Sequence, residues 1–115
     1  MIVPFGLPDV FSKLPMNNEK LCQSEIEQRL TNLEIDFERE CKIGPGSYID
    51  FLIGDVGVEV KLKGQSRSRI QEQIRRYAKF DQVGKILLVT GTAIHLPAFI
   101  ESKPCRTLSL GASWL

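Results

Sequence analysis

The sequence predicts an α/β fold in which a mixed central sheet is flanked by helices. Segments at about 18 to 34 and 69 to 80 show apolar residues at helical spacing, and strand-like segments lie between them. An apolar run bounded by glycines, Lys85 to Thr90, reads as a strand buried on both faces. Strand, helix and buried strand in succession favour a parallel crossover. A last strand is expected from Arg106 to Leu110.

The N-terminal residues differ in character from the rest of the chain. Residues 1 to 17 contain three prolines, too many for a helix or a central strand. They are predicted to form an extended arm that either packs across the domain or makes a subunit contact. Residues 18 to 115 are expected to form one domain, because a chain of this length supports a single core.

The middle of the chain predicts three strands and a capped helix. A first strand is expected at 35 to 42, before the turn Gly44-Pro45-Gly46. A β-hairpin is expected from Tyr48 to about Leu62, because apolar and β-branched residues alternate on both sides of Gly54-Asp55. Ser68 is the expected N-cap of the second helix.

The hairpin register brings three charged residues to one face. If Ile53 pairs with Val56, then Asp50 lies opposite Glu59, where like charges destabilise a sheet. Lys61 emerges on the same face, two residues beyond Glu59. A site rich in carboxylate oxygens suits Mg²⁺ or Mn²⁺ better than zinc, and Mg²⁺ commonly binds substrate phosphates as well. The sequence therefore predicts a metal-dependent reaction on a phosphate ester, in which Lys61 orients the attacking water and stabilises developing charge.

Charge is unevenly distributed along the chain, although the formal net charge is only +1. Residues 19 to 40 hold seven acidic and three basic side chains, whereas residues 61 to 85 hold eight basic and two acidic ones. The basic segment favours contact with a phosphate backbone, and the alternative is a solvated helix face. The side chains predicted to position a nucleic-acid strand are Lys63, Arg67, Arg69, Arg75, Arg76 and Lys79.

Cysteine content and the N-terminus predict the compartment. The three cysteines are an odd number without CxxC spacing, which fits free thiols in a reducing cytosol better than disulfides or a zinc site. The N-terminal segment has prolines, an aspartate and no early basic cluster, so it is predicted to be neither a signal peptide nor a membrane span. We therefore expect a cytoplasmic protein without membrane contact.

Three spaced motifs resemble those of a known superfamily. They are Gly46-x-x-x-Asp50, then Glu59-Val60-Lys61, then Gln73-x-x-x-Tyr77. Together they resemble the PD-(D/E)xK nucleases, and most closely the small Holliday-junction-resolvase-like and RecB-like members. The resemblance implies a restriction-endonuclease-like αβββαβ core. It also implies a Mg²⁺- or Mn²⁺-dependent endo- or exonuclease that hydrolyses DNA phosphodiester bonds with water, including branched or processed DNA.

The same resemblance implies roles for individual residues. Asp50, Glu59 and the backbone carbonyl of Val60 would bind the metal, and Lys61 would be the catalytic lysine. Gln73 would orient the lysine, the water or a DNA phosphate.

An acid from the first helix and a helix tyrosine complete the implied site. Glu25 is chosen as the acid because it lies at the edge of the helix's apolar face, and Glu34 and Glu40 are weaker candidates. Tyr77 would support its helix against the sheet or contact DNA.

Partners and alternatives follow from the same features. A homodimer would supply the two sites that symmetric cutting of two strands requires. The alternative function is a non-catalytic nucleic-acid-binding or assembly module that retains the nuclease fold. A purely structural domain with a surface ion cluster is a third interpretation.

Overall fold

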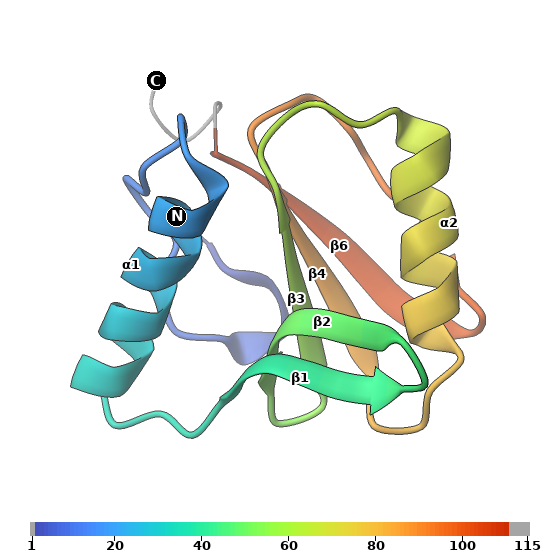
Figure 1. The fold of residues 1–115 in the computed structure, drawn as a ribbon, viewed down its shortest axis with the longest axis horizontal. Coiled ribbons are helices and arrows are strands. Elements are labelled where there is room, and N and C mark those ends of the chain that lie inside the picture. Colours follow the sequence, from blue (N-terminus) through green and yellow to red (C-terminus); the bar gives the residue numbers. More distant parts are fainter. Residues whose placement is uncertain (1, 111–115) are drawn as a thin grey trace.

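In the computed structural model, which describes residues 2–110, two helices lie on opposite faces of a mixed sheet (Figure 1). The sheet order is β1-β2-β3-β4-β6-β5; β1 to β3 are antiparallel neighbours, β3, β4 and β6 run parallel, and β5 is antiparallel to β6. The elements are η1 (Pro4–Gly6), α1 (Glu19–Asn32), β1 (Glu38–Gly44), β2 (Ser47–Ile53), β3 (Val56–Lys61), α2 (Arg67–Ala78), β4 (Lys85–Thr90), β5 (Phe99–Ile100) and β6 (Lys103–Ser109).

The predicted α/β class, mixed sheet, hairpin and parallel crossover are confirmed. The predicted cap of α2 is wrong by two residues: Ser66 is the N-cap, and its Oγ accepts a hydrogen bond from the Arg69 N–H at 3.3 Å. Ser68 lies inside the first turn of α2, so it is not the residue that caps the helix N-terminus. Strand β1 begins at residue 38 rather than 35, β6 begins at 103 rather than 106, and the short β5 was not predicted.

Strand β3 divides the two cores between its faces. Val56, Val58 and Val60 pack with α1, whereas the alternate residues, including Glu59, face α2. The predicted register is confirmed at Ile53–Val56, Leu52–Gly57 and Phe51–Val58. Alternation along one strand therefore places apolar residues in one core and the charged residues on the other face.

The hairpin β1–β2 crosses from one core to the other at Asp50. Phe51 packs in the α1 core, but Ile49 and its cross-strand partner Cys41 pack in the α2 core. In a regular strand, residues two apart share a face, so the chain must twist sharply between them. Glu40, opposite this point on β1, has a φ of +50°, a left-handed conformation that costs about 1–2 kcal/mol for a residue other than glycine.

The N-terminal arm packs across the domain, the first of the two predicted alternatives. Val10, Phe11 and Leu14 are fully buried in the α1 core. Arg29 of α1 holds the arm in place, because its Nη1 donates to the Val10 carbonyl at 3.3 Å and to the Ser12 carbonyl at 2.6 Å. The arm is thus a structural part of the domain.

The three cysteines are free thiols, as predicted, and the structure shows that all three are buried. Burial is the main cause that raises the pKa of the Cys22 and Cys41 thiols to about 11. These two thiols therefore stay protonated near neutral pH and are poor nucleophiles. Among the helices of residues 2–110, none is long and apolar enough to cross a bilayer.

Close packing between β2 and β3 gives a first testable prediction. A Cβ added at Gly57 would overlap the Ile49 Cδ1 and lie 3.2 Å from the Val83 Cγ1. Gly57→Ala is therefore expected to lower the free energy of unfolding by about 1–3 kcal/mol in urea denaturation. Ile49→Val removes the overlapping methyl, so it should cost less stability in the Gly57→Ala background than alone. Equal costs in both backgrounds would contradict this explanation.

Candidate active site

Asp50 and Glu59 come together where the β2–β3 ladder stops. The paired residues end at Phe51 and Val58, and beyond them side chains replace the backbone ladder. The Val60 N–H donates to Asp50 Oδ2 at 2.8 Å, and the Asp50 N–H donates to Glu59 Oε1 at 3.2 Å. The predicted proximity of the two acids is confirmed. However, they lie just beyond the last backbone-paired residues of β2 and β3, not within a continuous ladder.

The two carboxylates are strained electrostatically. Glu59 is 2% exposed, and burial, followed by the charge of Asp50, raises its pKa to about 8. Burial also raises the pKa of Asp50, although its hydrogen bond from Val60 and the nearby charges of Lys61 and Arg39 act in the opposite direction. Removing two adjacent carboxylates from water favours a proton or a cation between them.

Lys61 lies on the same face, as predicted. Its Nζ is 3.5 Å from Glu59 Oε2, and its side chain is 16% exposed. Lys61 ends β3 and pairs with Thr90, which ends the parallel strand β4. The cluster therefore lies at the carboxyl ends of neighbouring parallel strands, where ligands of α/β proteins commonly bind.

Helix α2 reaches the cluster through a tyrosine. Gln73 Nε2 donates to the Tyr77 hydroxyl at 2.6 Å, and that hydroxyl donates to Glu59 Oε2 at 3.3 Å. Tyr77 is buried, and burial together with the Glu59 charge raises its pKa. The structure thus places Tyr77 as a support between helix and sheet, not as an exposed DNA contact. Gln73, predicted to reach the acids, is connected to Glu59 only through the Tyr77 hydroxyl.

Glu25, the chosen acid of the first helix, belongs to a different contact. Its Oε2 pairs with Arg29 Nε at 2.9 Å, so it orients the arginine that holds the N-terminal arm. The weaker candidates are exposed: Glu34 follows the end of α1, and Glu40 lies 3.5 Å from Arg39 Nη1. Within residues 2–110, none of the three makes a hydrogen bond or an ion pair with Asp50 or Glu59.

Glu19 is the acid that α1 brings to this part of the sheet. It is the first residue of the helix, after the N-cap Asn18, and its Oε1 accepts from the Leu62 N–H at 3.0 Å. Besides burial in the α1 core, the charges of Glu19 and Asp50 both raise the pKa of the Cys22 thiol. Glu19 was missed because it precedes the amphipathic stripe. The asparagine before it marked the helix start that brings it here.

Arg39 is a second residue that the sequence did not identify. Its Nη1 donates to the Asp50 carbonyl at 3.5 Å, and its Nη2 donates to Gln23 Oε1 at 2.8 Å. The guanidinium also stacks 4.9 Å from the Phe51 ring centroid and lies 3.7 Å from Glu27 Oε2. Arg39 therefore ties α1 to the hairpin at the point where Asp50 is held. Apolar and polar residues alternate only weakly along β1, so the sequence did not show that Arg39 faces α1 and Asp50.

The donor set can be compared with the needs of a metal ion. Within residues 2–110, no three His, Cys, Asp or Glu side chains form a group arranged to hold a metal. Mg²⁺ nevertheless often binds through one or two carboxylates, with water and phosphate oxygens completing its shell. Asp50 and Glu59 fit that requirement, because they are adjacent, oxygen-only donors whose mutual repulsion a divalent cation would relieve.

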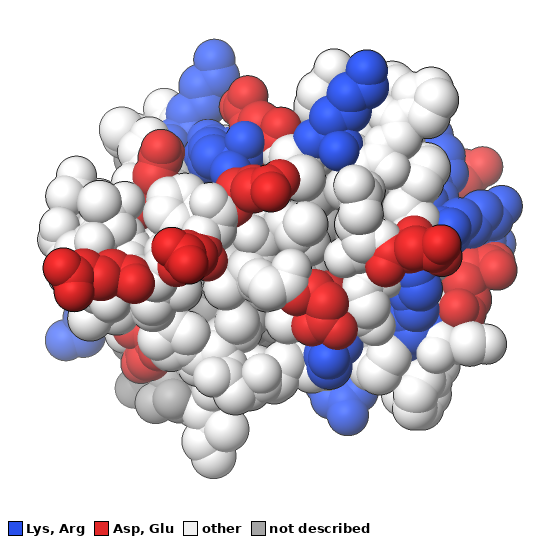
Figure 2. Space-filling model, turned by 90° about the horizontal axis from the view of Figure 1, so that it is seen from below, with Lys and Arg blue, Asp and Glu red and all other residues white. Residues whose placement is uncertain are grey.

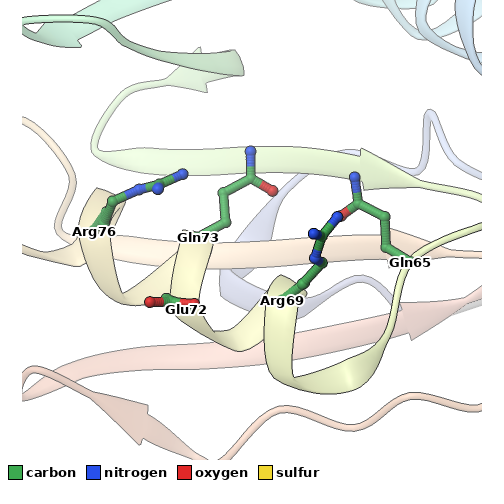
Figure 3. Close-up of a pocket in the computed structure, with 5 residues that line it drawn as sticks. All are labelled: Gln65, Arg69, Glu72, Gln73 and Arg76. Carbon is green, nitrogen blue, oxygen red and sulfur yellow. The ribbon is translucent and has the colours of Figure 1, made fainter.

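The basic residues that cluster in the sequence do not form one continuous basic surface on the face shown in Figure 2. Figure 2 shows Lys and Arg interleaved with Asp and Glu on the face seen from below, not a continuous basic patch. Arg75 pairs with Glu101 at 3.9 Å, whereas Arg69 and Arg76 line a groove on α2 with Gln73 (Figure 3). Other predicted nucleic-acid contacts are exposed on α2, just after it, or on the loop before it: Lys63, Arg67 and Lys79.

Comparison of the chain with protein-family models, curated proteins and solved structures gave no match. A function is therefore proposed from the residues, their geometry and the motif resemblance.

Proposed function

We propose that this protein is a metal-dependent nuclease that hydrolyses DNA phosphodiester bonds and has a restriction-endonuclease-like core. The observation that carries the proposal is the cluster of Asp50, Glu59 and Lys61, which joins one ammonium to two carboxyl groups that would repel each other if both were ionised. A domain without a charged ligand gains nothing from burying such a pair, because burial of like charges is costly. The order α1, β1 to β3, α2, β4 is compatible with the αβββαβ core.

Each residue of the cluster has a distinct part in the proposed reaction. Asp50 and Glu59 would hold Mg²⁺ or Mn²⁺, with the Val60 carbonyl as the further ligand that the motif resemblance implies. Such a cation, when bound, acidifies water and offsets charge on the phosphate. Lys61 would orient the attacking water and stabilise the charge that develops on the phosphate oxygens. Tyr77 fixes the Glu59 carboxylate, and Gln73 fixes Tyr77.

A cleavage screen tests the proposal directly. Labelled linear, flapped and four-way DNA would each be incubated with the protein in Mg²⁺, in Mn²⁺ and in EDTA. We expect cleavage of at least one substrate in the presence of metal and none in EDTA. If no substrate is cut in either metal, the nuclease proposal is wrong.

One observation favours a second candidate, a nucleic-acid-binding or assembly module without catalysis. Both Glu59 oxygens already have protein partners, namely the Asp50 N–H on one side and Tyr77 with Lys61 on the other.

Thermal unfolding with added metal separates the two candidates. A nuclease should be stabilised by Mg²⁺ or Mn²⁺, by about 2.7 kcal/mol at one hundred times the dissociation constant. Asp50→Asn should abolish that response, whereas a module would show no metal response.

The two acids of α1 allow a matched comparison. Glu19→Gln is expected to lower the cleavage rate by about 10- to 100-fold, because Glu19 holds the Leu62 backbone next to Lys61 and a small displacement of a catalytic group costs up to about 100-fold. Glu25→Gln should leave the rate unchanged, since Glu25 contacts the arm-holding Arg29. Single-turnover kinetics on one DNA substrate measures both. A larger loss for Glu25→Gln would reverse the assignment.

A further inference from the structure

A polar groove follows one side of α2 beside the candidate active site. It has a volume of about 300 Å³ (Figure 3). The lining residues include no aromatic ring, so the groove offers no aromatic platform for bases. Its lining consists of Gln65, Arg69, Glu72, Gln73 and Arg76.

The donors of the groove form a row. Arg69, Gln73 and Arg76 are spaced by four and three residues, which places them on one side of the helix. Figure 3 shows their side chains and that of Gln65 on the same side of α2, with the Glu72 carboxylate set apart from them. Arg69 and Arg76 are seven positions apart, which separates them by about 10 Å along the helix axis, so their side chains can reach different phosphates.

The two arginines of the row lack acidic partners. Neither Arg69 nor Arg76 makes an ion pair with any residue of the described range, 2–110. Their helix neighbour Arg75 pairs with Glu101 at 3.9 Å, and Lys85 pairs with Asp55 at 2.9 Å. The groove therefore presents two guanidinium groups that form no ion pair within that range, together with one carboxylate, Glu72. Guanidinium groups bind phosphate in a directed manner.

Gln73 belongs both to this groove and to the candidate active site. Its Nε2 donates to the Tyr77 hydroxyl, which donates in turn to Glu59 Oε2. A phosphate held beside Gln73 would thus lie two side chains from the carboxylate pair.

We propose that this groove binds the phosphodiester backbone of one nucleic-acid strand next to the bond to be cut. Arg69 and Arg76 contact different phosphates of that strand, Gln73 lies between them, and no base is read. The inference rests on the proposed function for its ligand. It adds that one edge of α2, rather than its whole basic surface, sets the position of the strand.

Binding without metal tests the groove separately from catalysis. Fluorescence anisotropy of a short labelled single strand would be measured in EDTA over a series of salt concentrations. Arg69→Ala and Arg76→Ala are each expected to weaken binding about tenfold and to reduce the slope of log K against log salt by about 0.7. Arg75→Ala removes the same charge from the same helix outside the groove, so it should weaken binding less than twofold.

Three results would overturn the groove assignment. These are an equal loss for Arg75→Ala, unchanged binding by both groove variants, and displacement of the strand by equimolar pyrophosphate, which would indicate a small-anion site. Arg76→Gln keeps a good helix former and repeats the test if an alanine variant unfolds. A protein that binds through Arg69 and Arg76 but never cuts would refute the nuclease proposal alone. If the wild-type protein cuts DNA but Arg69→Ala and Arg76→Ala bind the strand normally, only the groove assignment would be refuted.

Discussion

Lys61→Ala is expected to lower the rate of DNA cleavage by about 100- to 1000-fold, the usual cost of removing a group that stabilises transition-state charge. Lys61 is the one ammonium shown within 4 Å of Glu59 among residues 2–110, and its side chain remains partly accessible to a substrate. Its loss should leave DNA affinity in EDTA largely intact, because the groove arginines lie on a different element. Single-turnover cleavage and anisotropy together measure the two effects.

A matched lysine serves as the control for this variant. Lys85 also ends in an ion pair, with Asp55 at 2.9 Å, but it begins β4 and so lies at the opposite end of the sheet from Lys61. Lys85→Ala should cut DNA at the wild-type rate. Persistent cleavage by Lys61→Ala, or an equal loss for Lys85→Ala, would show that the site has been misassigned.

Glu59→Gln is expected to make the metal-free protein more stable than the wild type at alkaline pH. Glu59 titrates near 4.3 in an unfolded chain, and its folded pKa is raised to about 8 by burial and by Asp50. The folded state therefore favours the protonated acid. Its contribution to stability is complete below about pH 4.3 and is lost as the pH rises through 8. Glutamine imitates the protonated acid and does not titrate, so the two proteins should differ little at pH 5.

The size of this effect is a few kcal/mol at pH 9 in EDTA, by the linkage between a raised pKa and stability. Urea denaturation at pH 5, 7 and 9 would measure the difference between Glu59→Gln and the wild type. Glu34→Gln, which changes an exposed acid at the end of α1, should show no such trend. Saturating Mg²⁺ should reverse the order at pH 9, because only the wild type keeps both carboxylates. A difference that does not depend on pH would contradict the electrostatic explanation.

Local pattern alone sufficed for the central part of the candidate site. The two-residue repeat of a strand requires Glu59 and Lys61 to share a face, and the turn at Gly54-Asp55 fixes the register that brings Asp50 to Glu59. These relations are confirmed because they involve residues only a few positions apart along one hairpin. The helical spacing from Gln73 to Tyr77 is local for the same reason.

Contacts between distant segments could not be predicted in this way. Glu25 and Glu19 belong to the same helix, and spacing favoured the one at the margin of the apolar stripe. Two tertiary contacts decide which acid approaches the site. The start of α1 lies beside Leu62, and Arg29, which pairs with Glu25, is bonded to the N-terminal arm. Neither is encoded in the periodicity of the helix.

The sequence by itself determined the α/β class, the hairpin and the shared face of Asp50, Glu59 and Lys61, because strand and helix periodicity are local properties of the chain. Tertiary structure alone decided the acid that α1 presents, the twist at Asp50 that Arg39 holds, and the difference between Arg75 and the arginines of the groove. These depend on how separate elements pack, and packing is decided by buried area and long-range hydrogen bonds that no short motif records.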